Sequence, residues 1–265
     1  MGHSHSPDHA QATSPASGPA TGAATLLVLM LHQAYGGPAG NTPQKLDALF
    51  AHLAAHHHCV LPGEPLLADR LNFCLSFDDG YLDFLQFVLP SLGRHNLRAL
   101  LAIPTALPFE TCDIPESRRL EMPSVSPAPH TIREGLCTWD ELRTVAASGR
   151  VAFAAHGMTH IRLDAPAADL AKEIVESGNT LAGRLGVPVD SFVFPHGRFS
   201  RSALALVRRH YRHAFRIGDA SLRGWSSPVL YRVSADGFAN PEELFAPQRL
   251  RRYARRAWWN RLRGR

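Results

Sequence analysis

An apolar run at residues 71–77 ends abruptly in two adjacent aspartates and a glycine. The run has the length and composition of a buried β-strand, in which successive side chains point to opposite faces. Asp78 and Asp79 therefore stand at its carboxyl end and face different directions, and Gly80 allows the backbone to turn there. Adjacent like charges oppose each other's ionisation unless a positive charge lies beside them, and a metal ion would supply that charge. The alternative is an ordinary strand-end turn, where Asp-Gly is common.

Two further apolar runs end in polar motifs. Residues 151–155 have the pattern of a short buried strand and lead into His156 and His160, and residues 191–194 lead into a turn that contains His196. Neutral imidazole is a good ligand for zinc, iron, cobalt or nickel, although an isolated histidine pair is more often a surface or core feature. Because α/β folds and βα barrels place their chemistry at the carboxyl ends of strands, the three motifs together predict one shared site.

Strand-like and helical patterns alternate along the chain, which predicts an α/β fold with a mostly parallel sheet. The helical patterns are residues 42–58, 81–94, 139–148, 167–185 and 200–211, and residues 97–103, 213–217 and 229–233 are further strand-like runs. Residues 1–22 are rich in Ser, Pro, Ala, Gly and His without an apolar period, so we expect a disordered tail. We expect residues 23–246 to form one domain of ordinary size and residues 247–265 to form a separate basic helix.

The motifs resemble those of the polysaccharide deacetylases (NodB-homology superfamily, carbohydrate esterase family 4). The matching segments are Ser76-Phe77-Asp78-Asp79-Gly80, His156-x-x-x-His160, Phe192-x-Phe194-Pro195-His196-Gly197 and Thr138-Trp139-Asp140-Glu141-Leu142. The resemblance implies a distorted (β/α) barrel of NodB-homology type and a metal-dependent carbohydrate N-deacetylase, a hydrolase acting on carbon–nitrogen bonds other than peptide bonds. It also implies that Asp79, His156 and His160 hold one divalent metal ion, with zinc preferred and iron, cobalt or nickel as alternatives.

The same resemblance assigns the catalytic roles. Asp78 would be the general base, and the backbone N–H of His196 would help to hold the oxyanion. The sequence departs from the common family pattern at two places: Leu230-Tyr231-Arg232 replaces the late Leu-x-His motif, and Val193 stands where an arginine is usual.

Both departures are shared by a subgroup that resembles the poly-N-acetylglucosamine deacetylases. In that subgroup an early strand-end histidine is the general acid. A closed barrel places its first strand beside its last. His32, which follows the apolar run at residues 26–31, is therefore the first candidate for the acid, and His196 is the second.

Charge is concentrated at the carboxyl terminus. The chain carries a formal net charge of +5, and Arg249–Arg265 contains eight arginines and no acidic residue, so residues 1–248 carry −3. Leu250, Tyr253, Ala254, Ala257, Trp258 and Leu262 follow helical spacing. This pattern is typical of a helix lying on an anionic membrane, and packing against the barrel is the alternative. No other feature supports a nucleic-acid partner.

The four cysteines form no CxxC pair, which favours free thiols in a reducing compartment. The apolar run at residues 23–31 is too short to span a bilayer and lacks a basic flank, so we interpret it as the first strand. We therefore expect a cytoplasmic protein, peripheral at the inner membrane if the basic helix binds lipid.

The motifs and the family resemblance favour one function, the removal of an N-acetyl group from an amino sugar in cell-surface polysaccharide, O-antigen or lipopolysaccharide synthesis. A close variant is a deformylase of a lipid-linked amino sugar. An Fe(II) oxygenase also uses two histidines and one carboxylate, but its usual scaffold is all-β. A non-catalytic carbohydrate-binding module is the third alternative: the presence of Asp78 argues against it, and the missing late histidine favours it.

Overall fold

The computed structural model describes residues 24–35, 40–122, 133–238 and 240–262. The expected disorder of residues 1–22 lies outside these ranges. The strands are β1 (Thr25–Leu31), β2 (His58–Cys59), β3 (Leu71–Asp78), β4 (Ala99–Ile103), β5 (Val151–Ala155), β6 (Ser191–Val193), β7 (His213–Ile217) and β8 (Leu230–Ser234). Every pairing between them is parallel, as the alternation of strands and helices predicts.

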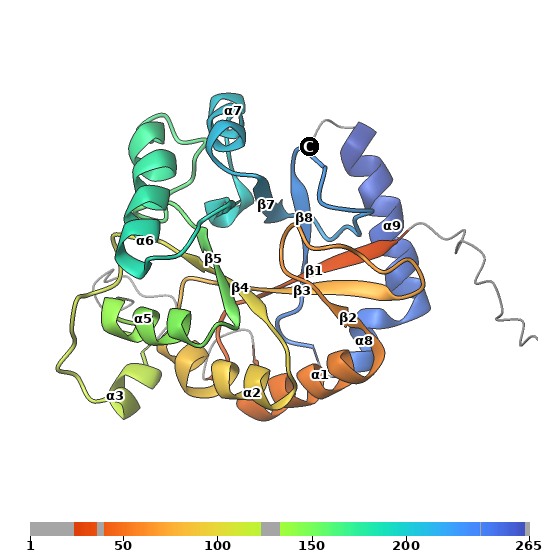
Figure 1. Cartoon of the computed structure of the whole chain (residues 1–265). Coiled ribbons are helices and arrows are strands. Elements are labelled where there is room, and N and C mark those ends of the chain that lie inside the picture. Colours follow the sequence, from red (N-terminus) through yellow and green to blue (C-terminus); the bar gives the residue numbers. More distant parts are fainter. Residues whose placement is uncertain (1–23, 36–39, 123–132, 239, 263–265) are drawn as a thin grey trace, which may run out of the picture.

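The sheet closes into a distorted (β/α) barrel of NodB type (Figure 1). Strand β1 pairs with β8 on one side and with β3 on the other, so β1, β3, β4, β5, β6, β7 and β8 form the ring. The short β2 pairs only with the start of β3. Closure places the end of the first strand between the end of the last strand and the Asp78–Asp79 pair, as expected for His32.

Helices surround the barrel (Figure 1). They are α1 (Pro43–His56), α2 (Leu89–Arg94), α3 (Glu116–Leu120), α5 (Trp139–Ala147), α6 (Ser177–Leu185), α7 (Arg201–His210), α8 (Pro241–Phe245) and α9 (Pro247–Leu262). Helices α1, α5, α7 and α8 start with a side-chain cap. The Thr42 side chain accepts a hydrogen bond from the Lys45 N–H, and Thr138 and Glu141 form a reciprocal capping box at the start of α5.

Two predicted helices differ from a regular α-helix. Residues 81–94 contain a π-helical turn, η1 (Phe84–Val88), in which the Leu89 N–H bonds to the Phe84 carbonyl, and α2 follows it. Pro90 has no N–H to donate, which disfavours a regular α-helical ladder at this point. Residues 167–185 likewise combine a π-helical turn, η2 (Ala171–Glu176), with α6.

The core has two layers around the sheet. One cluster inside the barrel includes Val28, Cys74, Leu100, Ala154 and Phe215. A larger cluster between the sheet and the helices is built from the alternate strand positions and the apolar faces of α1, η1, α2 and α5. Among the described residues, no helix is both long enough and apolar enough to cross a membrane.

Candidate metal and catalytic site

The backbone at the end of β3 separates the two aspartates. Asp78 is the last residue of the strand, whereas Asp79 and Gly80 both adopt left-handed conformations, with φ of 71° and 75°. The Gly80 N–H bonds back to the Asp78 carbonyl at 2.9 Å and closes the turn. The adjacent carboxylates therefore lie in different surroundings, as the sequence predicts.

Asp79, His156 and His160 bring one donor atom each into a common site, and these three atoms lie within 4.8 Å of one another. The Asp79 Oδ1 atom is 3.7 Å from His156 Nε2 and 3.4 Å from His160 Nε2, and the two Nε2 atoms are 3.2 Å apart. Ligands bound tetrahedrally at the usual zinc distances are about 3.3 Å from each other. The three side chains therefore fit a zinc-sized divalent ion.

His156 is held in the form that a metal ligand needs. Its side chain is 2 % exposed, and its Nδ1 atom lies 2.8 Å from the Val193 carbonyl oxygen. A carbonyl can only accept, so Nδ1 carries the proton and the Nε2 lone pair faces Asp79 and His160. Burial lowers the pKa of His156 to about 4, which leaves the imidazole neutral at pH 7.

The loop that carries both histidines is fixed by Glu173 from η2. This buried carboxylate accepts hydrogen bonds from the Met158 N–H at 2.7 Å, the Thr159 N–H at 3.1 Å and the Thr159 hydroxyl at 2.5 Å. Gly157 has a φ of 75°, and a Cβ atom there would lie 2.8 Å from the Glu173 Oε2 atom. Glu173 therefore positions the loop, and only glycine fits beside it.

Asp78 is paired with an arginine inside the barrel. Arg232 on β8 donates from Nη1 to Asp78 Oδ1 at 2.6 Å and from Nη2 to Oδ2 at 2.8 Å, and both side chains are buried. Burial alone would raise the pKa of Asp78, but the charges of Arg232, His156 and His32 and the two hydrogen bonds hold it well below its usual range. Asp78 is therefore ionised and oriented.

His32 lies beside Asp78, at the end of β1. Its Nε2 atom is 3.7 Å from Asp78 Oδ2, and its Nδ1 atom is 2.6 Å from Asp236 Oδ2. Burial lowers the pKa of His32, but the Asp236 hydrogen bond and the nearby carboxylates outweigh it and raise the pKa to about 9. His32 is thus protonated at pH 7, with Asp236 bonded to one ring nitrogen and Asp78 near the other.

His196 lies at the edge of the site. Its backbone φ is 55°, its ring centroid is 4.6 Å from that of His160, and its Nε2 atom is 3.2 Å from the His160 carbonyl oxygen. Its side chain is exposed. The structure therefore places His196 beside a candidate metal ligand, while His32 lies beside Asp78.

Backbone strain is concentrated in this region. Five described residues other than glycine have positive φ, and three of them are Asp79, His160 and His196. Such conformations cost of order 1–3 kcal/mol each and persist where the surrounding structure enforces them. Their presence in one site is the pattern expected of a functional centre.

Sequence analysis missed three supporting residues. Arg232 was visible only as a departure from the family motif, although strand alternation places it on the same face as Leu230, inside the barrel. Asp236 and Glu173 carry no local signal, because each acts on a residue distant in sequence. Their roles appear only when the barrel closes.

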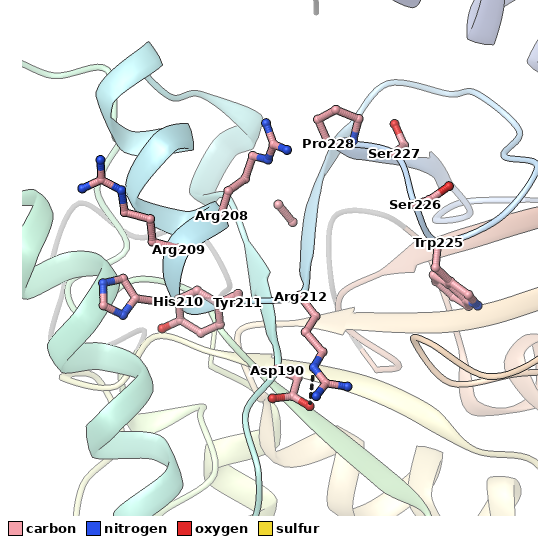
Figure 2. A pocket seen from close by; sticks show the side chains of 11 residues that line it. Asp190, Arg208, Arg209, His210, Tyr211, Arg212, Trp225, Ser226, Ser227 and Pro228 are labelled. Atoms are coloured by element: carbon pink, nitrogen blue, oxygen red, sulfur yellow. Dashed lines mark ion pairs between the residues drawn. The ribbon is translucent and has the colours of Figure 1, made fainter.

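The opposite end of the barrel has a basic pocket of about 430 Å³ (Figure 2). Asp190 and Arg212 directly precede β6 and β7, so the pocket lies at the amino ends of the strands. Its remaining lining residues are Arg208, Arg209, His210, Tyr211, Ala214, Trp225, Ser226, Ser227 and Pro228. Asp79, His156 and His160 follow the carboxyl ends, so this pocket is separate from the candidate metal site.

Comparison with known proteins gives one family match. A family model described as polysaccharide deacetylase matches residues 70–214, which is more than half of the chain. The matched segment contains Asp78, Asp79, His156, His160 and His196. No curated protein matches the chain in a sequence search.

Several solved structures share the fold. The Streptococcus pyogenes deacetylase PplD in complex with acetate has a TM-score of 0.65 at 18 % identity and covers 83 % of this chain and 96 % of its own. A de-N-acetylase from Aggregatibacter actinomycetemcomitans has a TM-score of 0.64 at 20 % identity, with 83 % and 99 % covered. IcaB from Ammonifex degensii has a TM-score of 0.61 at 15 % identity, with 81 % and 93 % covered. At these identities the likeness shows a common fold.

Proposed function

The chain belongs to the polysaccharide deacetylase family, carbohydrate esterase family 4, and we propose that it hydrolyses the N-acetyl group of an amino sugar with the help of one divalent metal ion. One observation carries this proposal. The metal-ligand triad of Asp79, His156 and His160 lies directly beside a separate carboxylate, Asp78, whose Oδ2 atom is 4.0 Å from His156 Nε2. Amide hydrolysis by this route needs both a metal site and a base that does not bind the metal.

The metal, zinc by preference, would be held by Asp79, His156 and His160, and when bound it would polarise the amide carbonyl and lower the pKa of water. Asp78 accepts the proton of the attacking water as general base. The backbone N–H of His196 donates to the oxyanion. His32 then gives its proton to the leaving amine, which departs as the free amino sugar, and the acetyl group leaves as acetate.

The pairing of Asp78 and His32 supports these roles. Arg232 keeps Asp78 ionised and fixes the direction of its oxygens, while Asp236 keeps His32 protonated. A base and an acid with pKa values displaced in opposite directions are thus 3.7 Å apart. His196 remains the second candidate for the acid, and its exposed side chain makes it the weaker one.

The substrate we propose is an N-acylated amino sugar of a cell-surface polysaccharide, such as O-antigen or lipopolysaccharide. We include lipid-linked forms presented at the cytoplasmic face of the inner membrane, which the protein would reach through contact of residues 249–265 with lipid. A deformylase of a lipid-linked amino sugar would use the same residues, because formyl and acetyl amides differ by one methyl group.

Two other functions are less consistent with the site. A carbohydrate-binding module has no need for a buried, arginine-paired Asp78, because burying ionised groups is costly unless they are well paired. An Fe(II) oxygenase shares the two-histidine, one-carboxylate ligand set. The parallel βα barrel and the family match argue against an Fe(II) oxygenase.

The proposal is tested by acyl release. The zinc-loaded protein is incubated with a short N-acetylglucosamine oligomer and, separately, with N-acetyl and N-formyl forms of a lipid-linked amino sugar, and free acetate and formate are measured. We expect Asp78→Asn to lower release by about 10²–10⁴-fold. Asp190→Asn, at the other end of the barrel, serves as the matched control and should leave release unchanged. Equal release by wild type and Asp78→Asn would refute the proposal.

A further inference from the structure

Helix α9 packs on the barrel with one face and leaves the other uncovered. Tyr253 is 3 % exposed, and the half-buried Leu250, Ala257 and Asn260 lie on the same side of the helix. Trp258 and Trp259, by contrast, are 57 % and 51 % exposed. The single apolar face that the sequence suggested is therefore divided, and Trp258 points away from the barrel. Large tryptophan side chains left in water at neighbouring positions indicate a contact surface.

The arginines of α9 also form two groups. Arg252 and Arg256 both approach Asp219, at 3.8 and 3.3 Å, and so anchor the helix to the barrel. Arg251 and Arg255 are exposed, and within the described part of the chain no ion pair involves either. With about 3.6 residues per turn, these two arginines lie between Trp258 and Trp259 around the helix axis. The outward face thus combines two cations with two tryptophans.

The end of α9 lies at the catalytic end of the barrel. Asn260 Nδ2 is 3.4 Å from the Gly218 carbonyl oxygen, directly after the end of β7. The last residue of β7, Ile217, is level with Arg232 in the strand register, and Arg232 binds Asp78. Ile217 is itself 40 % exposed and lines a pocket of about 400 Å³ together with Trp259. Trp259 therefore lies beside the carboxyl end of β7, at the end of the barrel that carries the candidate metal site.

From these observations we infer that α9 docks the protein on an anionic lipid bilayer. Trp258 and Trp259 would enter the headgroup layer, and Arg251 and Arg255 would pair with lipid phosphates. Tryptophan favours the membrane interface and arginine an anionic surface, so one face satisfies both. The residues 247–265 contain no acidic side chain, which removes repulsion from anionic lipid. Docking in this way brings the last turns of α9, and with them the carboxyl end of β7, close to the membrane surface.

The inference deepens the proposed function, because it specifies how a lipid-linked substrate would reach the site, but its test requires no turnover. The full chain is sedimented with phosphatidylcholine vesicles that contain or lack phosphatidylglycerol, at low and high salt. We expect binding only with phosphatidylglycerol, weakened by salt. Each arginine near an anionic surface contributes about fivefold to binding, so Arg251→Gln with Arg255→Gln should weaken it about 30-fold.

The tryptophans are tested separately. Brominated lipid should quench the wild-type fluorescence, and Trp258→Ser with Trp259→Ser should abolish both the quenching and most of the binding. The chain has four tryptophans, and the other two, Trp139 and Trp225, are buried or half-buried. The changed side chains are exposed, so the urea midpoint should stay at the wild-type value and show that the variants fold.

A charge-matched control is available at the other end of the barrel. Arg208→Gln with Arg209→Gln removes the same charge from the exposed end of α7 and should leave vesicle binding unchanged. The inference would be overturned if this control lost as much binding as the α9 variant, or if the protein bound vesicles without phosphatidylglycerol. It would also be overturned if α9 mediated a dimer and the protein did not bind vesicles. A protein that deacetylates a soluble sugar but binds no anionic vesicle would overturn the docking and leave the proposed function intact.

Discussion

Charged side chains are buried and paired at one end of the barrel and exposed at the other. At the carboxyl ends of the strands, Asp78 and Arg232 are 4 % and 1 % exposed and share two short hydrogen bonds. At the amino ends, Arg212 is 80 % exposed and lies 3.9 Å from Asp190, which is 60 % exposed (Figure 2). Charges in water cost almost nothing to keep, whereas buried charges are tolerated only when they are paired.

The contrast extends to the backbone. Asp79, His160 and His196 at the carboxyl end hold left-handed conformations that L-residues avoid. Of the non-glycine residues in the described ranges that share this conformation, only Asn96 lies near the amino ends, between α2 and β4. Strained backbone and buried charge occur together at the carboxyl end, as expected of a functional site. The arginines at the amino end are exposed and need no such explanation.

The largest effect should follow from the loss of a metal ligand. Asp79→Asn removes the one anionic member of the triad, so we expect metal affinity to fall by more than the roughly 10–100-fold that loss of an outer partner costs. Titration with zinc, followed by calorimetry, measures this change, and acetate release should fall in parallel. Zinc affinity equal to that of wild type would show that the metal binds elsewhere.

Breaking the buried ion pair should come next. Arg232→Met leaves Asp78 buried without its partner and should reduce the free energy of unfolding by about 3–5 kcal/mol in urea titrations. The pair holds the pKa of Asp78 below its unfolded value of about 3.9, so its stabilisation is present above that pH and is lost as pH falls through the folded pKa. In wild type the contribution of the pair should therefore be fully present above about pH 5. A change below about 1 kcal/mol would contradict the contrast between the two ends.

A smaller effect is expected from Asp236→Asn, which removes the carboxylate that raises the pKa of His32 to about 9. His32 is protonated below this pKa, so activity that depends on it as the acid is lost as pH rises through about 9. In the variant the pKa falls and the alkaline limb of the pH–rate profile moves to lower pH, with about a 10-fold lower rate at neutral pH. An unchanged alkaline limb would favour His196 as the acid.

The smallest effect is predicted at the amino end. Arg212→Gln breaks an exposed ion pair and should change the free energy of unfolding by no more than about 0.5 kcal/mol. Acetate release should match wild type, because the pocket of Figure 2 is separate from the candidate metal site. A loss of activity would show that the amino end affects catalysis and would contradict the functional independence of the two ends.

The parts of the fold and the site that the sequence predicted are those encoded locally. Asp79 and His156 directly follow β3 and β5, and His196 lies in the turn that follows β6, so their positions at the carboxyl ends could be deduced without a structure. The parallel barrel followed from alternating strands and helices. The π-helical turns could not be predicted, because their apolar spacing resembles that of an α-helix.

The parts that the sequence did not predict depend on contacts between distant residues. Arg232 reaches Asp78 across 154 positions, and Asp236 reaches His32 across 204. Only barrel closure brings them together. Helix α9 illustrates a different limit: its periodicity predicted an apolar face that includes both Tyr253 and Trp258, but the barrel covers only the first.

The most direct test of a metal-dependent deacetylase is a zinc titration of turnover. The protein is stripped with a chelator, zinc is added in fractions of an equivalent, and acetate release from an N-acetylated amino-sugar substrate is followed. With one site formed by Asp79, His156 and His160, release should rise linearly and reach a plateau at one zinc per chain. Release that is already complete in the stripped protein, or that continues to rise well beyond one equivalent, would contradict the single metal centre.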